Sequence, residues 1–260
     1  MTILNVRHTT VYRYRHPVRL GDHRLMLRPR DSHDLRLIRT NLNFSPAASV
    51  RWIHDVFGNS IAIASFAESA AELRIESRLQ LETYVVERPR CEVAPKAASY
   101  PFIYSADDRI DLGRMLERHY PDPSDRLGAW ARAFVRGNRT DTQALLADLN
   151  AGVKASISYQ SRETEGTQTP VETLDRGRGS CRDLATLLIE AARCLGFGAR
   201  VVTGYLYNPS ADSGDTAATG AGATHAWADI YLPGAGWIAH IWSSFSVQNA
   251  GTNSDRQLGI

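Results

Sequence analysis

The sequence predicts an α+β protein with an antiparallel β-sandwich at its N-terminus and a mixed domain of helices and strands after it. Residues 2–88 contain short runs of strand type and no amphipathic segment of helix length. Residues 89–123 are interrupted by prolines, and helical apolar spacing begins only beyond them. We therefore divide the chain into a β-sandwich domain at 1–90, a linker at 91–123, a core domain at 124–242 and a polar, frayed tail at 243–260.

The strands of the first domain are identified from alternation and from turn signals. Leu73, Ile75, Leu79 and Leu81 keep a period of two, which gives that strand one apolar and one charged face. The turn-rich sequence at 55–60 lies between two strand-type runs and predicts a hairpin. Further strands are expected at 11–14, 25–27, 35–37, 51–54 and 61–66.

Helices dominate the first part of the core domain. Ser124 is expected to cap a helix that carries Leu127 to Phe134, and a second helix covers 145–153. Thr169 followed by Pro170 has the spacing of a capping box with proline at the first helical position. The strongest helical pattern runs from about residue 181 to 195, with its apolar residues on one stripe. Strands are then expected at 200–206, 225–231 and 237–242.

Composition excludes several classes of protein. The formal net charge of +2 is too small to indicate binding to nucleic acid or to an anionic membrane. No apolar run approaches the roughly 20 residues of a membrane span. The first residues lack a signal-peptide core, so we expect a cytoplasmic protein. Three cysteines without C-x-x-C spacing predict neither a disulfide framework nor a zinc site, and we expect no metal or cofactor. The oligomeric state is left unassigned.

Cys181 stands at the start of the strongest predicted helix. Free N–H groups and the helix dipole stabilise a thiolate at such a position. We expect Gly177 and Gly179 to let a substrate backbone approach closely. Position alone leaves two alternatives open, a reactive thiol and a small buried apolar side chain.

His225 begins a predicted strand and follows a long loop at 208–223. A histidine in that position could serve as general base for a thiol, and the alternative is a surface histidine. Alternation places Trp227 and Asp229 on the face of His225, but Asp229 lies about 13 Å along the strand, too far to orient the imidazole. The loop is expected either to border the cleft or to be a tolerated surface insertion.

Two other reactive side chains of the strongest helix are assigned structural roles. Asp183 lies about 200° around the helix from Cys181, so we expect it to form a salt bridge or to fix the adjacent loop. Cys194 lies about 20 Å along the helix from Cys181, which excludes a disulfide between them and predicts a core position. Trp227 and Trp237 are expected to pack in the core, with lining of the cleft as the alternative.

The chain resembles the bacterial transglutaminase-like family. The resemblance rests on Gly179-Ser180-Cys181-Arg182-Asp183 with its following helix, on 199–206, and on Thr224-His225-Ala226-Trp227 through 232–237. The segments 8–14 and 55–59 are similar to the β-domain that precedes the core in that family. The resemblance covers most of residues 1–240. It implies a papain-like catalytic core with Cys181 as nucleophile and His225 as its base.

The activity implied by this resemblance is thiol-dependent acyl transfer on peptide or glutamine amides, by hydrolysis or by transamidation. Peptides or proteins are the expected substrates. The family places an aspartate on the strand after the Gly-Trp turn, and counting from His225 puts Ile241 at that position. Isoleucine cannot accept the imidazole N–H. The alternative is therefore an impaired scaffold that retains the fold and binds a peptide or protein.

Replacing Ile241 by aspartate tests the absence of the third catalytic residue. An aspartate would restore an acceptor for the imidazole N–H and stabilise its charged form, so Ile241→Asp should raise kcat/KM. Loss of the aspartate from a Ser-His-Asp protease costs about 10⁴ in kcat, and a Cys-His pair should gain less than that, because a thiol is more acidic than a hydroxyl. The same variant should alkylate at Cys181 at a lower pH. If a folded variant showed an unchanged rate and an unchanged alkylation profile, the proposal that the third catalytic residue is missing at position 241 would be refuted.

Overall fold

The structure is a computed structural model of the 260-residue chain. It describes residues 1–84, 92–161, 165–207, 224–240 and 256–259. The expectations for Ile241 and for the loop 208–223 therefore fall outside the described residues, as does Cys91. The chain forms two compact units: unit 1 comprises Met1–Glu87, Gly204–Thr224 and Asn249–Ile260, and unit 2 comprises Arg88–Thr203 and His225–Gln248.

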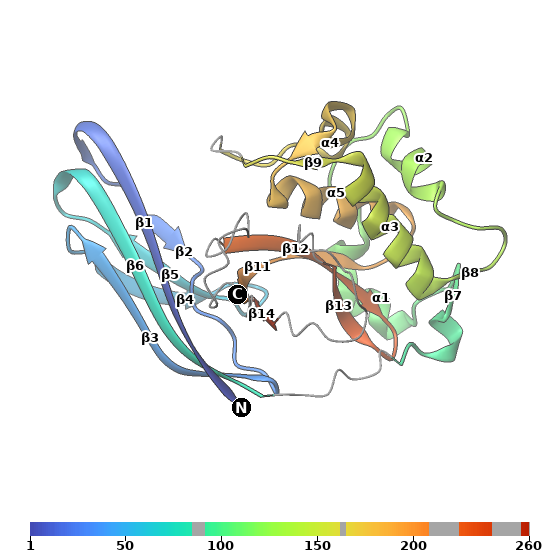
Figure 1. Ribbon diagram of the computed structural model, residues 1–260, viewed down its shortest axis with the longest axis horizontal. Coiled ribbons are helices and arrows are strands. Elements are labelled where there is room, and N and C mark those ends of the chain that lie inside the picture. Colours follow the sequence, from blue (N-terminus) through green and yellow to red (C-terminus); the bar gives the residue numbers. More distant parts are fainter. Residues whose placement is uncertain (85–91, 162–164, 208–223, 241–255, 260) are drawn as a thin grey trace, which may run out of the picture. The chain divides into compact units, whose positions relative to one another are not determined.

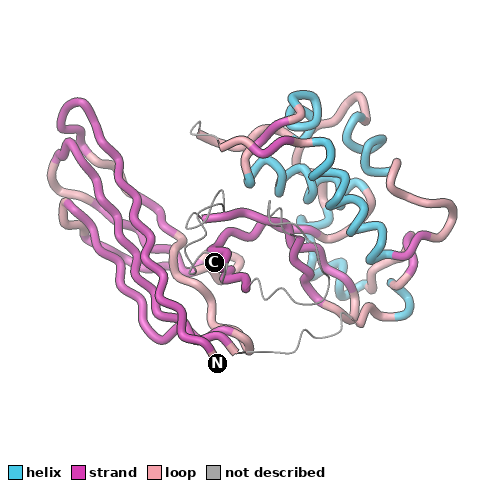
Figure 2. The backbone as a smooth tube through the Cα atoms, viewed as in Figure 1, coloured by secondary structure: helices cyan, strands magenta, loops and turns pink. Residues whose placement is uncertain are grey.

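Unit 1 contains two antiparallel three-stranded sheets, and the first 84 residues form strands and loops alone (Figure 2). Leu20, Leu73 and Ile75 are buried between strands, with Leu25 and Phe44 packed against them. The predicted antiparallel β-sandwich is therefore confirmed. One sheet has the order β1-β6-β3, with β1 Thr2–Arg19, β6 Ser69–Thr83 and β3 Leu35–Ser45, and the other has the order β2-β5-β4, with β2 His23–Leu25, β5 Ser60–Ser65 and β4 Ser49–His54.

The hairpin predicted at 55–60 connects β4 and β5. The carboxylate of Asp55 accepts the backbone N–H groups of Phe57 at 2.9 Å and Asn59 at 2.8 Å, and it also accepts the Asn59 side-chain amide at 2.7 Å. Gly58 has a φ of +75°, a conformation in which a side chain would be strained. A turn aspartate and a glycine therefore determine where the chain reverses.

Unit 2 holds the helices of the described chain, gathered around one central helix (Figure 1). The central helix is α5, and the helices α2, α3 and α4 all pack against it. The elements before β11 are η1 Pro95–Ala97, β7 Ser99–Tyr100, α1 Ala106–Leu112, η2 Gly113–Leu116, α2 Arg126–Arg132, β8 Thr140–Asp141, α3 Thr142–Ser156, β9 Ser158–Tyr159, α4 Pro170–Arg176, β10 Arg178–Gly179 and α5 Cys181–Cys194.

Helix α5 is buried around most of its circumference, although the sequence predicted a single apolar stripe. Leu184, Leu187 and Leu188 have almost no exposed surface, and they belong to the same cluster as Ala228 and Ile230 of β12. Polar positions of the helix are buried as well. The apolar stripe correctly predicted the helix. Its burial on the other faces comes from packing against three helices and a sheet, which the stripe did not indicate.

Residues 92–123 form packed structure in unit 2, where proline content had predicted a linker. They contain η1, β7, α1 and η2, and they bury Ala97, Tyr104 and Leu112. The Tyr104 hydroxyl donates a hydrogen bond to the Tyr231 carbonyl at 2.7 Å and accepts one from the Gly198 N–H at 3.1 Å. This proline-rich segment is folded because side chains such as Tyr104 attach it to parts of the chain that are distant in the sequence.

The predicted caps are correct for α4 and wrong for α2. The Thr169 hydroxyl accepts the Glu172 N–H at 3.2 Å, and Pro170 is the first residue of α4, as expected. Helix α2 is capped by Asp122 rather than Ser124: its carboxylate accepts the N–H groups of Arg126, Leu127 and Gly128 at 2.8–3.2 Å. The Asp122 side chain lies two residues before Ser124 and is longer, so it reaches the N–H groups that the sequence pattern had assigned to the serine.

The last strands form a sheet with the order β13-β12-β11-β14. Their bounds are β11 Ala199–Tyr207, β12 Thr224–Leu232, β13 Gly236–His240 and β14 Arg256–Gly259. Strand β14 pairs antiparallel with residues 204–207 of β11, whereas the sequence predicted a tail without regular structure. Sheet pairing uses main-chain groups, so a strand can form there without a periodic apolar pattern.

A buried ion pair within α5 is hydrogen-bonded to other segments of unit 2. The carboxylate of Glu190 lies 2.7 Å from the guanidinium of Arg193, and the two side chains are 1% and 7% exposed. Glu190 also accepts the His119 N–H at 2.9 Å, and Arg193 donates to the carbonyls of Met115 at 3.0 Å and Ala199 at 2.7 Å. Such a pair is tolerated because its remaining donors and acceptors are satisfied.

Removing the cation of this pair should destabilise the protein strongly. Arg193→Met leaves the Glu190 carboxylate buried without a counter-charge, and we expect a loss of about 3–5 kcal/mol in the free energy of unfolding. The matched control is Arg176→Met, which breaks the exposed 2.6 Å pair with Glu172 and should cost less than about 1 kcal/mol. Urea denaturation of both variants measures the difference. Equal losses would contradict a stabilising role for the buried network.

Candidate active site

Cys181 is the first residue of α5, and its side chain is half-buried. The loop before it is held by Asp183, which is fully buried. The Asp183 carboxylate accepts the backbone N–H and the hydroxyl of Ser180, both at 2.8 Å, and the backbone N–H of Gln168 at 2.7 Å. These hydrogen bonds agree with the fixing of the adjacent loop, which is one of the two structural roles expected for Asp183.

Gly179 is required by close packing within the protein. A Cβ atom at this position would lie 2.9 Å from the Cβ of Asp183 and 3.2 Å from a methyl group of Leu184. Gly177 has a φ of +60° and ends α4. Both glycines therefore serve the tight connection between α4 and α5, and the close approach expected at Gly179 is made by α5 instead of a substrate.

Strand order places His225 at the same end of unit 2 as Cys181. The Tyr231 N–H bonds to the Gly198 carbonyl at 2.9 Å, and Arg200 reaches Asp229 at 3.2 Å, so β11 and β12 run in opposite directions. The chain reverses between α5 and β11 within four residues, so β12 runs in the same direction as α5 (Figure 1). Cys181 and His225 each lie about 20 Å from the Gly198 end of their elements.

Tyr159 lies beside Cys181 and is a residue that the sequence interpretation missed. Strands β9 and β10 pair in parallel with Tyr159 opposite Gly179, and the Gln160 N–H bonds to the Gly179 carbonyl at 2.8 Å. The Tyr159 side chain is 51% exposed. Partial burial, together with the negative charge of the Cys181 thiolate, raises the pKa of its hydroxyl. The only signal in the sequence was an aromatic residue in a short polar segment.

Asp229 and Arg200 together connect three strands of the sheet. It forms an ion pair with Arg200 of β11 at 3.2 Å, and it accepts a hydrogen bond from the Trp227 indole. The Arg200 guanidinium in turn lies 4.1 Å from the ring centre of Trp237 in β13. Burial raises the pKa of Asp229, while Arg200 opposes this effect. Trp227 is 2% exposed, which agrees with the packing role expected for it.

Two family models match the chain. The model described as bacterial transglutaminase-like N-terminal region matches residues 4–82, and the model described as transglutaminase-like superfamily matches residues 128–240. Together they cover most of the chain. The chain belongs to the transglutaminase-like superfamily.

The chain is also similar to proteins of two mycobacteria and to a solved structure. Uncharacterized proteins of Mycobacterium tuberculosis and Mycobacterium bovis are 27% identical over 237 residues, which is 88% of this chain and 73% of theirs. The structure of a candidate cysteine protease from Cytophaga hutchinsonii aligns with a TM-score of 0.70 at 16% identity, over 99% of this chain and 80% of that one. At that identity the likeness concerns the fold, which is the transglutaminase-like α+β fold.

Cys194 ends α5 and packs against the core, and burial raises the pKa of its thiol. Cys181 and Cys194 are both free thiols. Within the described ranges, no group of three or more His, Cys, Asp or Glu side chains could hold a metal ion. None of the described helices is long and apolar enough to cross a membrane.

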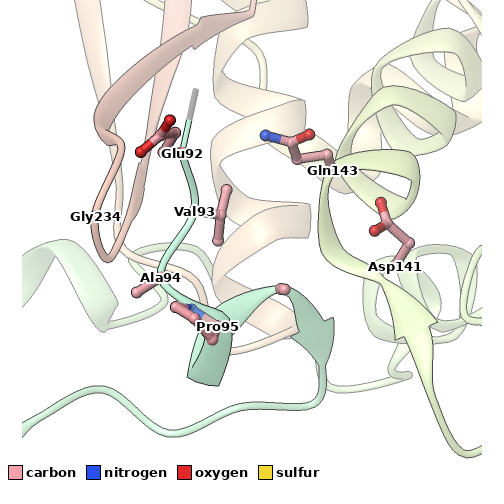
Figure 3. A pocket seen from close by; sticks show the side chains of 8 residues that line it. Glu92, Val93, Ala94, Pro95, Asp141, Gln143 and Gly234 are labelled. Atoms are coloured by element: carbon pink, nitrogen blue, oxygen red, sulfur yellow. The ribbon is translucent and has the colours of Figure 1, made fainter. Parts of the chain in front are cut away.

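A hollow of about 690 Å³ lies far from Cys181, at the turn between β12 and β13. Gly234 lies in this turn, and Glu92, Asp141 and Gln143 also line the hollow (Figure 3). The turn is at the opposite end of β12 from His225, more than about 20 Å along the strand. We assign the hollow no part in chemistry at Cys181.

His240 is a half-buried histidine of this sheet, and its imidazole faces away from water. It pairs with Ala228, whose side chain belongs to the core cluster. Its Nε2 atom has no hydrogen-bond partner in the part of the chain that the structure describes. Burial lowers the pKa of His240 from 6.5 to about 4. The folded protein therefore keeps this imidazole neutral.

Acid should destabilise the protein through His240. Between pH 6.5 and about 4 the unfolded chain binds a proton at this residue and the folded chain does not, so stability present above pH 6.5 is lost as the pH falls. The effect is at most about 3 kcal/mol. His240→Leu should therefore flatten the pH dependence of thermal unfolding between pH 7 and 4. The control, His54→Leu at an exposed strand position, should follow the wild type. A wild-type slope in His240→Leu would contradict the assignment.

Proposed function

We propose that this member of the superfamily is an enzyme of thiol-dependent acyl transfer, with Cys181 as nucleophile and His225 as general base and acid. The observation that carries the proposal is the position of Cys181, which is partly exposed and is the first residue of α5. His225 is the second residue of β12, whose start lies toward the same end of unit 2. Unpaired N–H groups and the helix dipole favour a thiolate there. Membership of a superfamily that is generally enzymatic supports it.

The proposed reaction proceeds through a thioester. The Cys181 thiolate adds to the carbonyl carbon of a peptide bond or of a glutamine side chain, and the backbone N–H of Cys181 donates to the developing oxyanion. The carbon–nitrogen bond then breaks, and the His225 imidazolium gives its proton to the leaving amine. Water, deprotonated by His225, attacks the thioester and releases the acid and the thiol. An amine in place of water would give transamidation, and we propose hydrolysis as the main outcome.

A peptide-binding scaffold is the second candidate function. The sequence supports it, because Ile241 stands where the family pattern has an aspartate. A scaffold would retain the fold and bind a peptide or protein but lack turnover. The two candidates differ in the reactivity of Cys181, since an activated thiol alkylates well below the pKa of about 8.5 of a free cysteine.

Replacing Cys181 by alanine should abolish acyl transfer and leave the fold intact. Removal of a nucleophile costs several orders of magnitude in rate. The measurement is amine release from peptide and glutamine substrates, together with labelling by a thiol-directed activity probe. Cys194→Ala is the matched control, and it should keep both activity and labelling. Turnover at the wild-type rate in Cys181→Ala would refute the enzyme proposal. If the wild-type protein turned over none of the substrates, the scaffold would be favoured.

A further inference from the structure

Two arginines border Cys181 on either side of the chain. Arg178 lies in β10, three residues before the thiol, and Arg182 is the next residue of α5. Both side chains are exposed. Consecutive Cα atoms are 3.8 Å apart, so the Cα atoms of both arginines lie within about 11 Å of that of Cys181.

These two arginines are not neutralised by described carboxylates, unlike their neighbours. Arg176 pairs with Glu172 at 2.6 Å, and Arg126 lies 3.6 Å from Asp175. No described carboxylate lies within 4.0 Å of the guanidinium of Arg178 or Arg182. The acidic side chains closest to them in sequence are therefore already paired or, like Asp183, buried.

Among the described residues that flank Cys181 in the sequence, exposed positive charge therefore exceeds exposed negative charge. Asp183 contributes one negative charge, but its carboxylate is fully buried and its hydrogen bonds go to Ser180 and Gln168. Arg178 and Arg182 contribute two exposed positive charges, and the N-terminus of α5 adds a partial one. At an ionic strength of 0.1 M the Debye length is about 10 Å, which is comparable with these Cα separations, so salt screens the two charges at the thiol only in part.

We propose that Arg178 and Arg182 are specificity-determining residues that select acyl donors with carboxylate side chains beside the target amide, so that the preferred substrates are acidic peptides. The inference rests on the proposed role of Cys181. Guanidinium groups bind carboxylates in a two-pronged geometry that a lysine cannot reproduce. Exposed pairs of this kind are individually weak, so the two arginines together should give a preference of about 3- to 10-fold.

Alkylation with a charged and a neutral reagent tests this selection without requiring turnover. Iodoacetate and iodoacetamide both modify Cys181, and mass spectrometry of the Cys181 peptide gives the two rates on the full chain. A changed thiol pKa affects both reagents alike, so the ratio of the two rates isolates the charge effect. The ratio should fall about 3- to 10-fold in Arg178→Gln/Arg182→Gln and stay constant in the control Arg176→Gln. Added salt should lower it in wild type only. An unchanged ratio in the double variant would overturn the proposal.

Matched peptides then separate this inference from the proposed function. One peptide carries aspartate next to the target amide and the other carries asparagine. We expect a kcat/KM about 3- to 10-fold higher for the aspartate peptide, with the preference lost in the double variant and kept in Arg176→Gln. Equal turnover of both peptides by wild type would refute the selection and leave the enzyme proposal standing. A charge-dependent alkylation ratio without turnover of either peptide would support the anion selection and refute acyl transfer.

Discussion

The burial of α5 is the constraint on which unit 2 depends. A helix enclosed by three other helices and a sheet must satisfy its buried polar side chains inside the protein, because they cannot reach bulk water. Glu190 and Arg193 meet this requirement through each other and through main-chain groups of residues 115–120 and 199. Asp183 meets it through Ser180 and Gln168. The polar residues of α5 therefore connect the helix to segments that are distant in the sequence.

The enclosure leaves the N-terminal end of α5 as its accessible part. Cys181 and the exposed Arg182 lie there, whereas the following residues are mostly buried. The antiparallel course of β11 and β12 returns the chain to that end, and His225 stands where β12 begins. A helix whose sides are covered can present a side chain to a substrate only from its end. Both candidate residues therefore lie toward the same end of unit 2.

Most of the architecture could be predicted from local patterns. Even spacing of Leu73, Ile75, Leu79 and Leu81 identified β6, and the turn residues 55–60 located a hairpin. Thr169 and Pro170 marked the start of α4. These signals were sufficient because each arises from contacts within one element or between adjacent elements. Cys181 at the start of α5 was identified in the same way, from the helical pattern that follows it.

The sequence by itself determined the types of the main strands and helices, the order of a β-rich region followed by a mixed region, and the position of Cys181 at the start of a helix. Tertiary structure decided the rest. Residues 92–123 are packed through Tyr104 and not a linker, Gly179 serves packing against α5, and Tyr159 is brought beside Cys181 by a parallel pairing with β10. Each of these depends on groups that are more than about ten residues apart or on a shared close contact. Local spacing contains no information about such partners, because only the folded chain brings them together.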